Sequence, residues 1–207
     1  MTCFRLLAAV LWLSPALAMS AEGNERFEKM KKDAAALSGV GTFLDKYVGS
    51  DCGSAAVGGS ECLKVSAEFR REATGKKFFM IVSDDQTSVL TMGRSSGNSY
   101  TMNLTPFFPG SNSAITHGSP SRADAAGNPV LPFITIDGIV PELESPATAA
   151  RWITTRAVRL EVIFTPQGTW TLPKKGGGKN TGVKARLEAV RVVVARSGEV
   201  LGVWFNR

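Results

Sequence analysis

The sequence predicts an α+β protein, with N-terminal helices followed by a mostly antiparallel β-sheet that is curled as a barrel or sandwich. Three observations support this class. Apolar residues before position 76 recur every three or four positions, as on one face of a helix. From Lys76 onward the apolar runs are short, rich in Val, Ile and Phe, and bounded by turn residues. Short turns join several of these runs, which favours antiparallel pairing.

Residues 1–18 are predicted to be a secretory signal peptide. Arg5 precedes the short apolar run 6–13, and the small residues of "ALA" at 16–18 are typical of a signal peptidase site. Cleavage is expected after Ala18, with cleavage after Ala21 as the second choice. The apolar run is too short to span a bilayer, and no later segment is longer. The mature protein is therefore expected to be soluble and exported, to the periplasm or to the extracellular medium.

Residues 19–75 are predicted to form a helical segment. A first helix is expected at 24–37, because apolar residues there form one stripe. A second, short helix is expected at 40–48. A third should begin near Ser60, and Gly75 should follow its end.

A disulfide between Cys52 and Cys62 is predicted within this segment. Cys3 leaves with the signal peptide, so an exported chain keeps an even number of cysteines. Closing so small a ring is worth about 2–3 kcal/mol in the chain-entropy treatment. The alternative is a redox pair or a metal site. The spacing is not CxxC and no histidine is near, so the sequence favours the structural bridge, and no metal site is expected.

Residues 76–207 are predicted to form the antiparallel β domain. Its apolar runs predict strands at 78–83, 88–94, 99–105, 133–140, 158–164, 168–172, 187–195 and 200–205. A short helix is expected at 145–153, with Pro146 in its first turn. Residues 106–132 are rich in Pro, Gly, Ser and Asn, so we expect an irregular loop; loops of that length are usually functional or mobile.

The charge is mildly basic. The chain of 207 residues has 24 basic and 18 acidic residues. Removal of residues 1–18 takes away Arg5 and no acid, which leaves 23 − 18 = +5. Such a balance favours anionic surfaces without requiring nucleic acid; the alternative is that it serves solubility alone.

The segment 174–182, "KKGGGKNTG", looks at first like a loop that binds phosphate. The nucleotide-binding pattern G-x-x-x-x-G-K-[ST] fails, because Asn180 follows Gly178-Lys179 and Pro173 stands where the first glycine belongs. No nucleotide or other cofactor is expected. The simplest interpretation is a flexible basic hairpin loop. The second is a contact with an anionic ligand, for which the candidate residues are Lys174, Lys175, Lys179, Lys184 and Arg186.

His117 is the sole histidine of the chain, so a serine hydrolase would have to use it as the base. Ser119 and Ser121 are close to it in sequence. No G-x-S-x-G motif is present, and a surface histidine is the simpler interpretation. No catalytic residue is therefore assigned.

Three aromatic residues, Phe107, Phe108 and Trp170, are near turns and prolines. They are expected to pack in the core, with the lining of a ligand groove as the alternative. Aromatic residues are absent between the lysines of 174–182, which argues against specific nucleic-acid binding.

The segments "ATGKKFFMIVSDDQ", "NLTPFFPG", "FTPQGTW", "LPKKGGGK" and "SGEVLG", with the two cysteines before them, resemble an uncharacterised family of secreted bacterial proteins of unknown function. The resemblance implies the bacterial envelope as the destination and implies no activity. The first hypothesis is a secreted, non-enzymatic binding module of the cell envelope. Its ligand would be an anionic polymer, a lipid surface or a partner protein. The alternatives are a secreted hydrolase using His117 with a nearby serine, and a purely structural envelope component.

Overall fold

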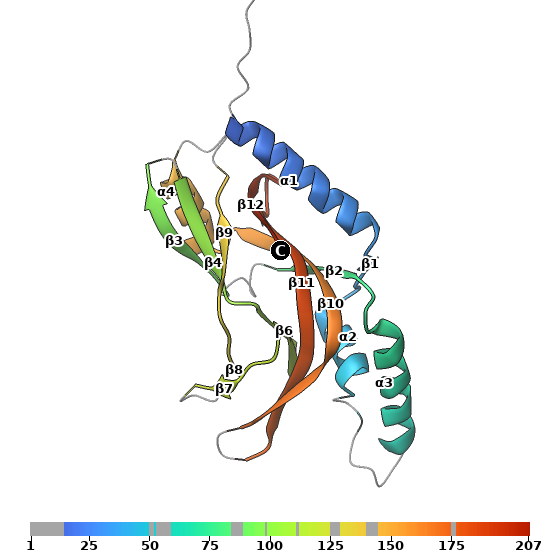
Figure 1. Ribbon diagram of the computed structural model, residues 1–207. Helices are drawn as coiled ribbons and strands as arrows, with labels where there is room; N and C mark the ends of the chain where they lie inside the picture. Colours follow the sequence, from blue (N-terminus) through green and yellow to red (C-terminus); the bar gives the residue numbers. More distant parts are fainter. Residues whose placement is uncertain are drawn as a thin grey trace, which may run out of the picture.

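The computed structural model describes residues 15–49, 52, 59–83, 89–97, 99–110, 112–124, 129–139, 145–174 and 177–207 (Figure 1). These residues form four helices: α1 (Pro15–Lys32), α2 (Val40–Val48), α3 (Gly59–Ala73) and α4 (Pro146–Thr154). The strands are β1 (Ala35–Ala36), β2 (Phe78–Val82), β3 (Leu90–Ser96), β4 (Ser99–Leu104), β5 (Phe107–Pro109), β6 (Ser113–His117), β7 (Arg122–Ala123), β8 (Pro129–Val130), β9 (Ile134–Asp137), β10 (Val158–Pro173), β11 (Lys179–Val194) and β12 (Val200–Phe205). The class is α+β, as predicted.

The main sheet is built around the long antiparallel hairpin β10–β11, in which each strand has 16 residues. Its strand order is β1-β2-β10-β11-β6-β5, and β12 also pairs with β11. β1 is parallel to β2 and β6 is parallel to β11, so the sheet is mixed although most of its pairs are antiparallel. A smaller antiparallel sheet, β3-β4-β9, meets β12 through a bridge between Gly138 and Gly202.

No sheet in the described part of the chain is closed or strongly curled, so the predicted barrel or sandwich is wrong. The main sheet ends in two very short strands, β1 and β5, which do not pair with each other. On the far side of β11, β6 pairs with one half of the strand and β12 with the other half. The edge of the sheet is therefore divided between two strands, and it does not return to β2.

The main sheet is covered on both faces. On one face of the hairpin, Val158, Leu160 and Val162 join the larger core, to which α2, α3, α4 and the smaller sheet also contribute. The strand predicted at 158–164 is thus confirmed as the first part of β10. On the other face, Ile163 and Ala189 pack against α1 through Phe27, in a second cluster of buried residues. Figure 1 shows α1 lying across one end of the hairpin, whose turn is far from it.

The region 106–132 is not an irregular loop throughout, because it contains β5, β6, β7 and β8. β6 lies inside the main sheet, between β11 and β5. Its sequence, Ser113–His117, is short and half polar, so it lacks the apolar alternation by which strands are found. The backbone pairing on both sides of β6 compensates for that weak pattern.

Several predicted boundaries also move. The first helix ends at Lys32 instead of 37, and Ala35–Ala36 forms a strand beside β2. The runs 158–164 and 168–172 belong to one strand, since register shifts at Ile163/Phe164 and at Pro166/Gly168 allow the chain to continue. The run 187–195 is the second half of a strand that already begins at Lys179.

The Cys52–Cys62 disulfide is confirmed, with the two Cα atoms 5.5 Å apart. It ties the segment after α2 to the first turns of α3. Residues 1–14 lie outside the described residues and 15–18 open α1, so the signal peptide and its cleavage stay predictions. Within the described ranges, no helix combines the length and the apolar character needed to cross a membrane.

Candidate anion-binding cavity

The segment "KKGGGKNTG" forms the end of the β10–β11 hairpin. The backbone N–H of Lys174 donates to the carbonyl of Gly178 (3.1 Å), and that of Gly177 donates to the carbonyl of Lys174 (3.1 Å). Gly177 and Gly178 have φ angles of 101° and 85°. Such angles are strained for any residue with a side chain, so these two glycines allow the turn to form. Lys175, one of the candidate residues, lies outside the described residues together with Gly176.

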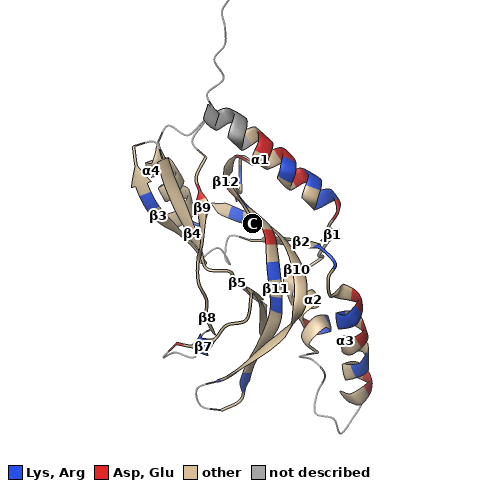
Figure 2. Cartoon of the chain, in the orientation of Figure 1, with Lys and Arg blue, Asp and Glu red and all other residues tan. Residues whose placement is uncertain are grey.

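Of the other four predicted basic residues, the structure brings two together. Lys174 follows the end of β10 and Lys179 begins β11, and both line one cavity. Lys184 and Arg186 are farther along β11, in the strand and not in the loop. Figure 2 shows basic residues in blue along β11. Arg186 forms an ion pair with Glu188 at 2.8 Å, so its charge is already balanced.

The cavity has a volume of about 390 Å³ and lies where the hairpin end meets β5 and β6. Phe107, Ser113, Trp170 and Thr181 contribute to its lining beside the two lysines. None of the lining residues that the structure describes is acidic. A concave site with two cations and no carboxylate attracts anions.

Trp170 is held in this wall by a glycine on the neighbouring strand. Trp170 pairs with Gly182 across the hairpin. A Cβ atom at position 182 would lie 2.4 Å from Cζ2 of the Trp170 ring and 2.3 Å from the carbonyl oxygen of Ala114 on β6. The last glycine of the segment therefore makes room for the indole.

Two buried polar atoms of the cavity wall have no hydrogen-bond partner in the described structure: Trp170 Nε1 and Ser113 Oγ. Trp170 is 6% exposed and Ser113 is 8% exposed. An unsatisfied buried donor costs about 1–3 kcal/mol, and native proteins contain few of them. The register places Trp170 in one row with Gly182 and Ala114, and Ser113 in the next row with Thr181, so the two side chains lie on opposite faces of the sheet.

His117 is the last residue of β6, four residues after Ser113. Its Nδ1 accepts a hydrogen bond from the backbone N–H of Leu187 at 3.1 Å, and its ring packs edge-on against Trp204. Burial lowers the pKa of His117 below its usual 6.5, against the opposing effects of a hydrogen bond to the Ala185 backbone and of Glu188. Ser119 and Ser121 are both exposed. Because Nδ1 accepts this hydrogen bond, the proton of the neutral imidazole is on Nε2, and neither nitrogen has a free lone pair with which to take a proton from a serine.

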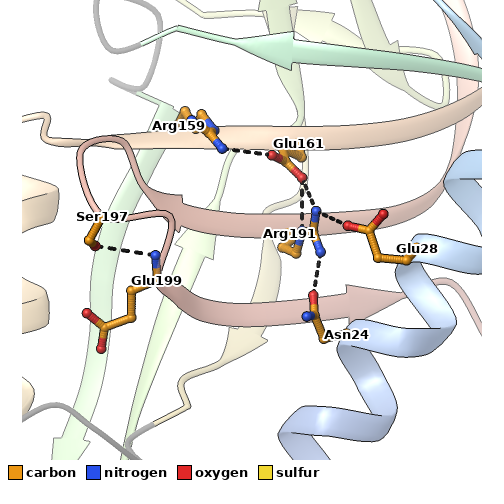
Figure 3. Close-up of polar contacts among 7 residues, drawn as sticks. All are labelled: Asn24, Glu28, Arg159, Glu161, Arg191, Ser197 and Glu199. Carbon is orange, nitrogen blue, oxygen red and sulfur yellow. Dashed lines mark hydrogen bonds and ion pairs between the residues drawn. The ribbon is translucent and has the colours of Figure 1, made fainter.

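The most buried charges lie at the opposite end of the hairpin, beneath α1 (Figure 3). Arg191 of β11 stands opposite Glu161 of β10 and forms an ion pair with it. The same guanidinium binds Glu28 at 2.6 Å, donates to Oδ1 of Asn24, and lies 4.3 Å above the ring of Phe27. The hydrogen bond from Arg191 is the main cause that lowers the pKa of Glu28. These contacts fix α1 to the sheet.

A second cavity, of about 600 Å³, lies between α1, β9 and β12. Its lining mixes charges of both signs, including Arg26, Asp137 and Arg207. Arg26 also lies 4.2 Å above the ring of Phe205. The hairpin-end cavity, whose described lining has two lysines and no acid, is therefore the stronger candidate for an anion. In the described ranges, no three His, Cys, Asp or Glu side chains come close enough to hold a metal ion.

The sequence pointed to the lysines and, as an alternative, to Phe107 and Trp170 as lining residues of a groove. It missed Ser113, because β6 was not expected, and it missed the role of Gly182. The role of Gly182 could have been found only from its pairing with Trp170 across the hairpin, and that pairing is known only once the strand register is known.

The fold and the site define an α+β protein with a small basic cavity at the end of a long β-hairpin. The chain belongs to the family of unknown function DUF6066, whose family model matches residues 3–207. Comparisons with curated proteins and with solved structures give no significant match.

Proposed function

We propose that the protein is an exported, non-enzymatic binding module of the bacterial cell envelope, and that the cavity at the hairpin end binds an anionic polymer or lipid surface. One observation carries the proposal: Lys174 and Lys179 stand at a cavity whose described lining contains no acid. Electrostatic attraction brings an anionic surface to such a site.

Three further features support export. The N-terminal segment has the order of a signal peptide. The α1 residues that contact the sheet, among them Asn24, Arg26, Phe27 and Glu28, follow both predicted cleavage positions. A chain cut after Ala18 or after Ala21 therefore keeps every one of these contacts. The disulfide is typical of an oxidising compartment.

The test is binding to phosphatidylglycerol vesicles and to lipopolysaccharide across a salt series. The Lys174→Ser/Lys179→Ser variant is compared with Lys64→Ser/Lys76→Ser, which removes the same charge from exposed positions elsewhere. We expect the first variant to bind about ten-fold more weakly at low salt, since each lost contact of this kind is worth up to about 1 kcal/mol. The second variant should bind as the unmodified protein does.

Equal losses in the two variants would mean that net charge alone attracts the surface, and the cavity would lose its assignment. Absence of binding by the unmodified protein, at any salt concentration, would overturn the proposal and favour a purely structural envelope component.

The alternative is a hydrolase that uses His117. The use of Nδ1 in a backbone hydrogen bond disfavours it, as does the lack of a described hydrogen bond between His117 and a serine. His117→Ala should leave vesicle binding unchanged. A hydrolytic activity that this variant loses would replace the binding module with the enzyme.

A further inference from the structure

We infer that the opening between β9 and β12 receives an extended segment of a partner protein, which adds to the strand edges there and presents an acidic residue to Arg26 and Arg207. This opening is the second cavity, of about 600 Å³. It lies beside α1, whereas the turn of the β10–β11 hairpin is far from α1 in Figure 1. The inference therefore concerns a different site from the proposed function and does not depend on it.

β9 and β12 meet at one point and separate from there. A bridge joins Gly138 and Gly202, where the two sheets come together. A Cβ atom at Gly202 would lie 2.8 Å from the carbonyl oxygen of Asp137, so the glycine permits this close approach. In the described residues, the pairing of β9 with β12 does not continue beyond the bridge. The residues that would continue it line the cavity instead.

The edge of β9 that faces the opening follows from the hydrogen bonds on its other side. The N–H of Gly138 donates to the carbonyl of Tyr100 at 2.8 Å, so the even-numbered residues of β9 pair with β4. The backbone groups of the odd-numbered residues point the opposite way. The carbonyl of Thr135 and the N–H of Asp137 are therefore directed toward β12.

The facing edge of β12 follows in the same manner. The N–H of Asn206 donates to the carbonyl of Glu188 at 2.9 Å, so the even-numbered residues at this end of β12 pair with β11. The carbonyl of Val203 and the N–H of Phe205 then point toward β9, and both residues line the cavity. Each edge thus offers one donor and one acceptor at the spacing of alternate residues. Extended peptides add to sheets through edges of this kind.

The charges at the opening select an acidic segment. Its described lining holds two cations, Arg26 and Arg207, and one acid, Asp137. None of the three forms an ion pair with a residue that the structure describes. Arg26 lies 4.2 Å above the ring of Phe205, so its guanidinium is placed beside the edge of β12. A carboxylate on the added strand would balance the excess positive charge, and guanidinium groups bind carboxylates through two parallel hydrogen bonds.

Amide hydrogen exchange, followed by NMR, tests whether the two edges are free. In the protein alone we expect the amides of Asp137 and Phe205 to exchange at least about a hundred-fold faster than those of Ile136 and Trp204, which face the neighbouring strands. Equal protection of all four amides would mean that β9 and β12 close on each other, and the inference would fail. Protection of Asp137 and Phe205 that appears only at high protein concentration would identify a second copy as the occupant and would overturn the assignment to a partner.

A phage-displayed library of random decapeptides supplies the probe. We expect the enriched peptides to alternate apolar and polar residues and to contain Asp or Glu. As synthetic peptides they should slow exchange at Asp137 and Phe205, and copies with methylated backbone nitrogens should not bind, because they lack the donors for strand pairing. If no enriched peptide protects these two amides, the inference is overturned.

Two pairs of variants test the backbone contact and the charge. Thr135→Pro removes an edge N–H that β4 does not use, as an edge strand tolerates, and Thr135→Val keeps that N–H. We expect Thr135→Pro to bind the selected peptide about ten-fold more weakly and Thr135→Val to bind it fully. Arg26→Gln should weaken binding about five-fold, whereas Arg122→Gln, which removes an exposed charge from β7, should not. Equal losses within either pair would overturn the inference, since it requires both the strand pairing and the acid.

The same variants separate this inference from the proposed function. Lys174→Ser/Lys179→Ser should bind the selected peptide fully, and Thr135→Pro should bind phosphatidylglycerol vesicles as the unmodified protein does. If the lysine variant also loses the peptide, the peptide is held at the hairpin end and the inference fails, while the proposed function stands.

Discussion

The two ends of the β10–β11 hairpin differ in whether their charged side chains have ion-pair partners. Beneath α1, the buried guanidinium of Arg191 is bound by Glu161 and Glu28. At the turn, Lys174 and Lys179 have no ion pair with any residue that the structure describes, and they stand beside a cavity. The same pair of strands therefore carries a saturated cluster, in which the buried guanidinium has acidic partners, and an unsaturated cluster, in which the two lysines have no described ion pair. The two clusters lie at opposite ends of the hairpin, far apart in Figure 1.

Whether a charged group has an ion-pair partner distinguishes a structural cluster from a candidate binding site more clearly than charge or burial alone. A buried ion pair with satisfied partners fixes one element to another and has nothing left to offer a ligand. Lysines without an ion pair keep their charge available for an anionic ligand. The end beneath α1 therefore serves folding, and the turn end is where the proposed binding would take place.

The largest expected effect comes from breaking the saturated cluster. Arg191→Met keeps an unbranched side chain over Phe27 but leaves Glu161, 3% exposed, buried without its main partner. Removal of one member of a buried pair typically costs about 3–5 kcal/mol. The free energy of unfolding, measured by urea denaturation, should fall by that amount. Lys179→Met should change it by less than about 0.5 kcal/mol. Similar losses in both variants would remove the distinction between the two ends.

The next effect comes from two glycines that each lie beneath an aromatic ring. A Cβ atom at Gly182 would collide with Trp170, and one at Gly138 would lie 2.3 Å from Cζ of Tyr100. Gly182→Ala and Gly138→Ala should each cost about 1–3 kcal/mol through overpacking. Only Gly182→Ala should also weaken vesicle binding, because Trp170 must move out of the cavity wall. Full binding by a folded Gly182→Ala protein would show that the position of Trp170 does not matter.

A smaller effect tests whether a buried hydroxyl with a hydrogen-bond partner, that of Tyr100, differs from one without a described partner, that of Ser113. The hydroxyl of Tyr100 donates to the carbonyl of Leu201 at 2.9 Å in a buried hydrogen bond. Tyr100→Phe should therefore lower the free energy of unfolding by about 1 kcal/mol. Ser113→Ala removes a hydroxyl without a described partner, so without ligand it should be neutral or slightly stabilising. A clear loss of stability in Ser113→Ala would mean that its Oγ already has a partner in the free protein.

The sequence predicted the class, most helices and strands, the disulfide and the basic hairpin turn, because these follow from periodicity, turn residues and spacing. It could not predict that Trp170 faces Gly182. That pairing follows from the hairpin closing at Pro173 and Lys179, and the first half of β11, which begins at Lys179, was not expected to be a strand. Ser113 was missed for a related reason: β6 is a strand only because β5 and β11 pair with it on both sides.

The cluster beneath α1 could have been predicted in part from the sequence. Arg191 interrupts a run of valines in "AVRVVVA", and Glu161 interrupts "RLEVIF". A single charge in an otherwise buried strand needs a partner, so two such strands in one hairpin indicate that their charges meet. The contacts of Asn24 and Glu28 with Arg191 could not be predicted in this way, because they depend on where α1 crosses the sheet.

The smallest expected effect is the pH dependence of the contact between α1 and Arg191. Arg191 lowers the pKa of Glu28 below its usual 4.5. An acid with a pKa lowered by folding adds stability above its unfolded pKa, and that stability disappears as the pH falls through the folded value. Glu28→Gln should therefore be less stable than the unmodified protein at pH 7, and the difference should shrink below about pH 4.5. The effect is small because the side chain of Glu28 is 45% exposed.

Urea denaturation across this pH range measures the difference, and Glu25→Gln on the exposed face of α1 is the matched control. The control should show no such pH-dependent difference, since no contact between Glu25 and the sheet is described. A Glu28→Gln difference that stays constant at acid pH would mean that the charge of Glu28 does not contribute. Arg191 would then hold α1 through Asn24 and Phe27 alone, and the saturation of the cluster would depend on Glu161.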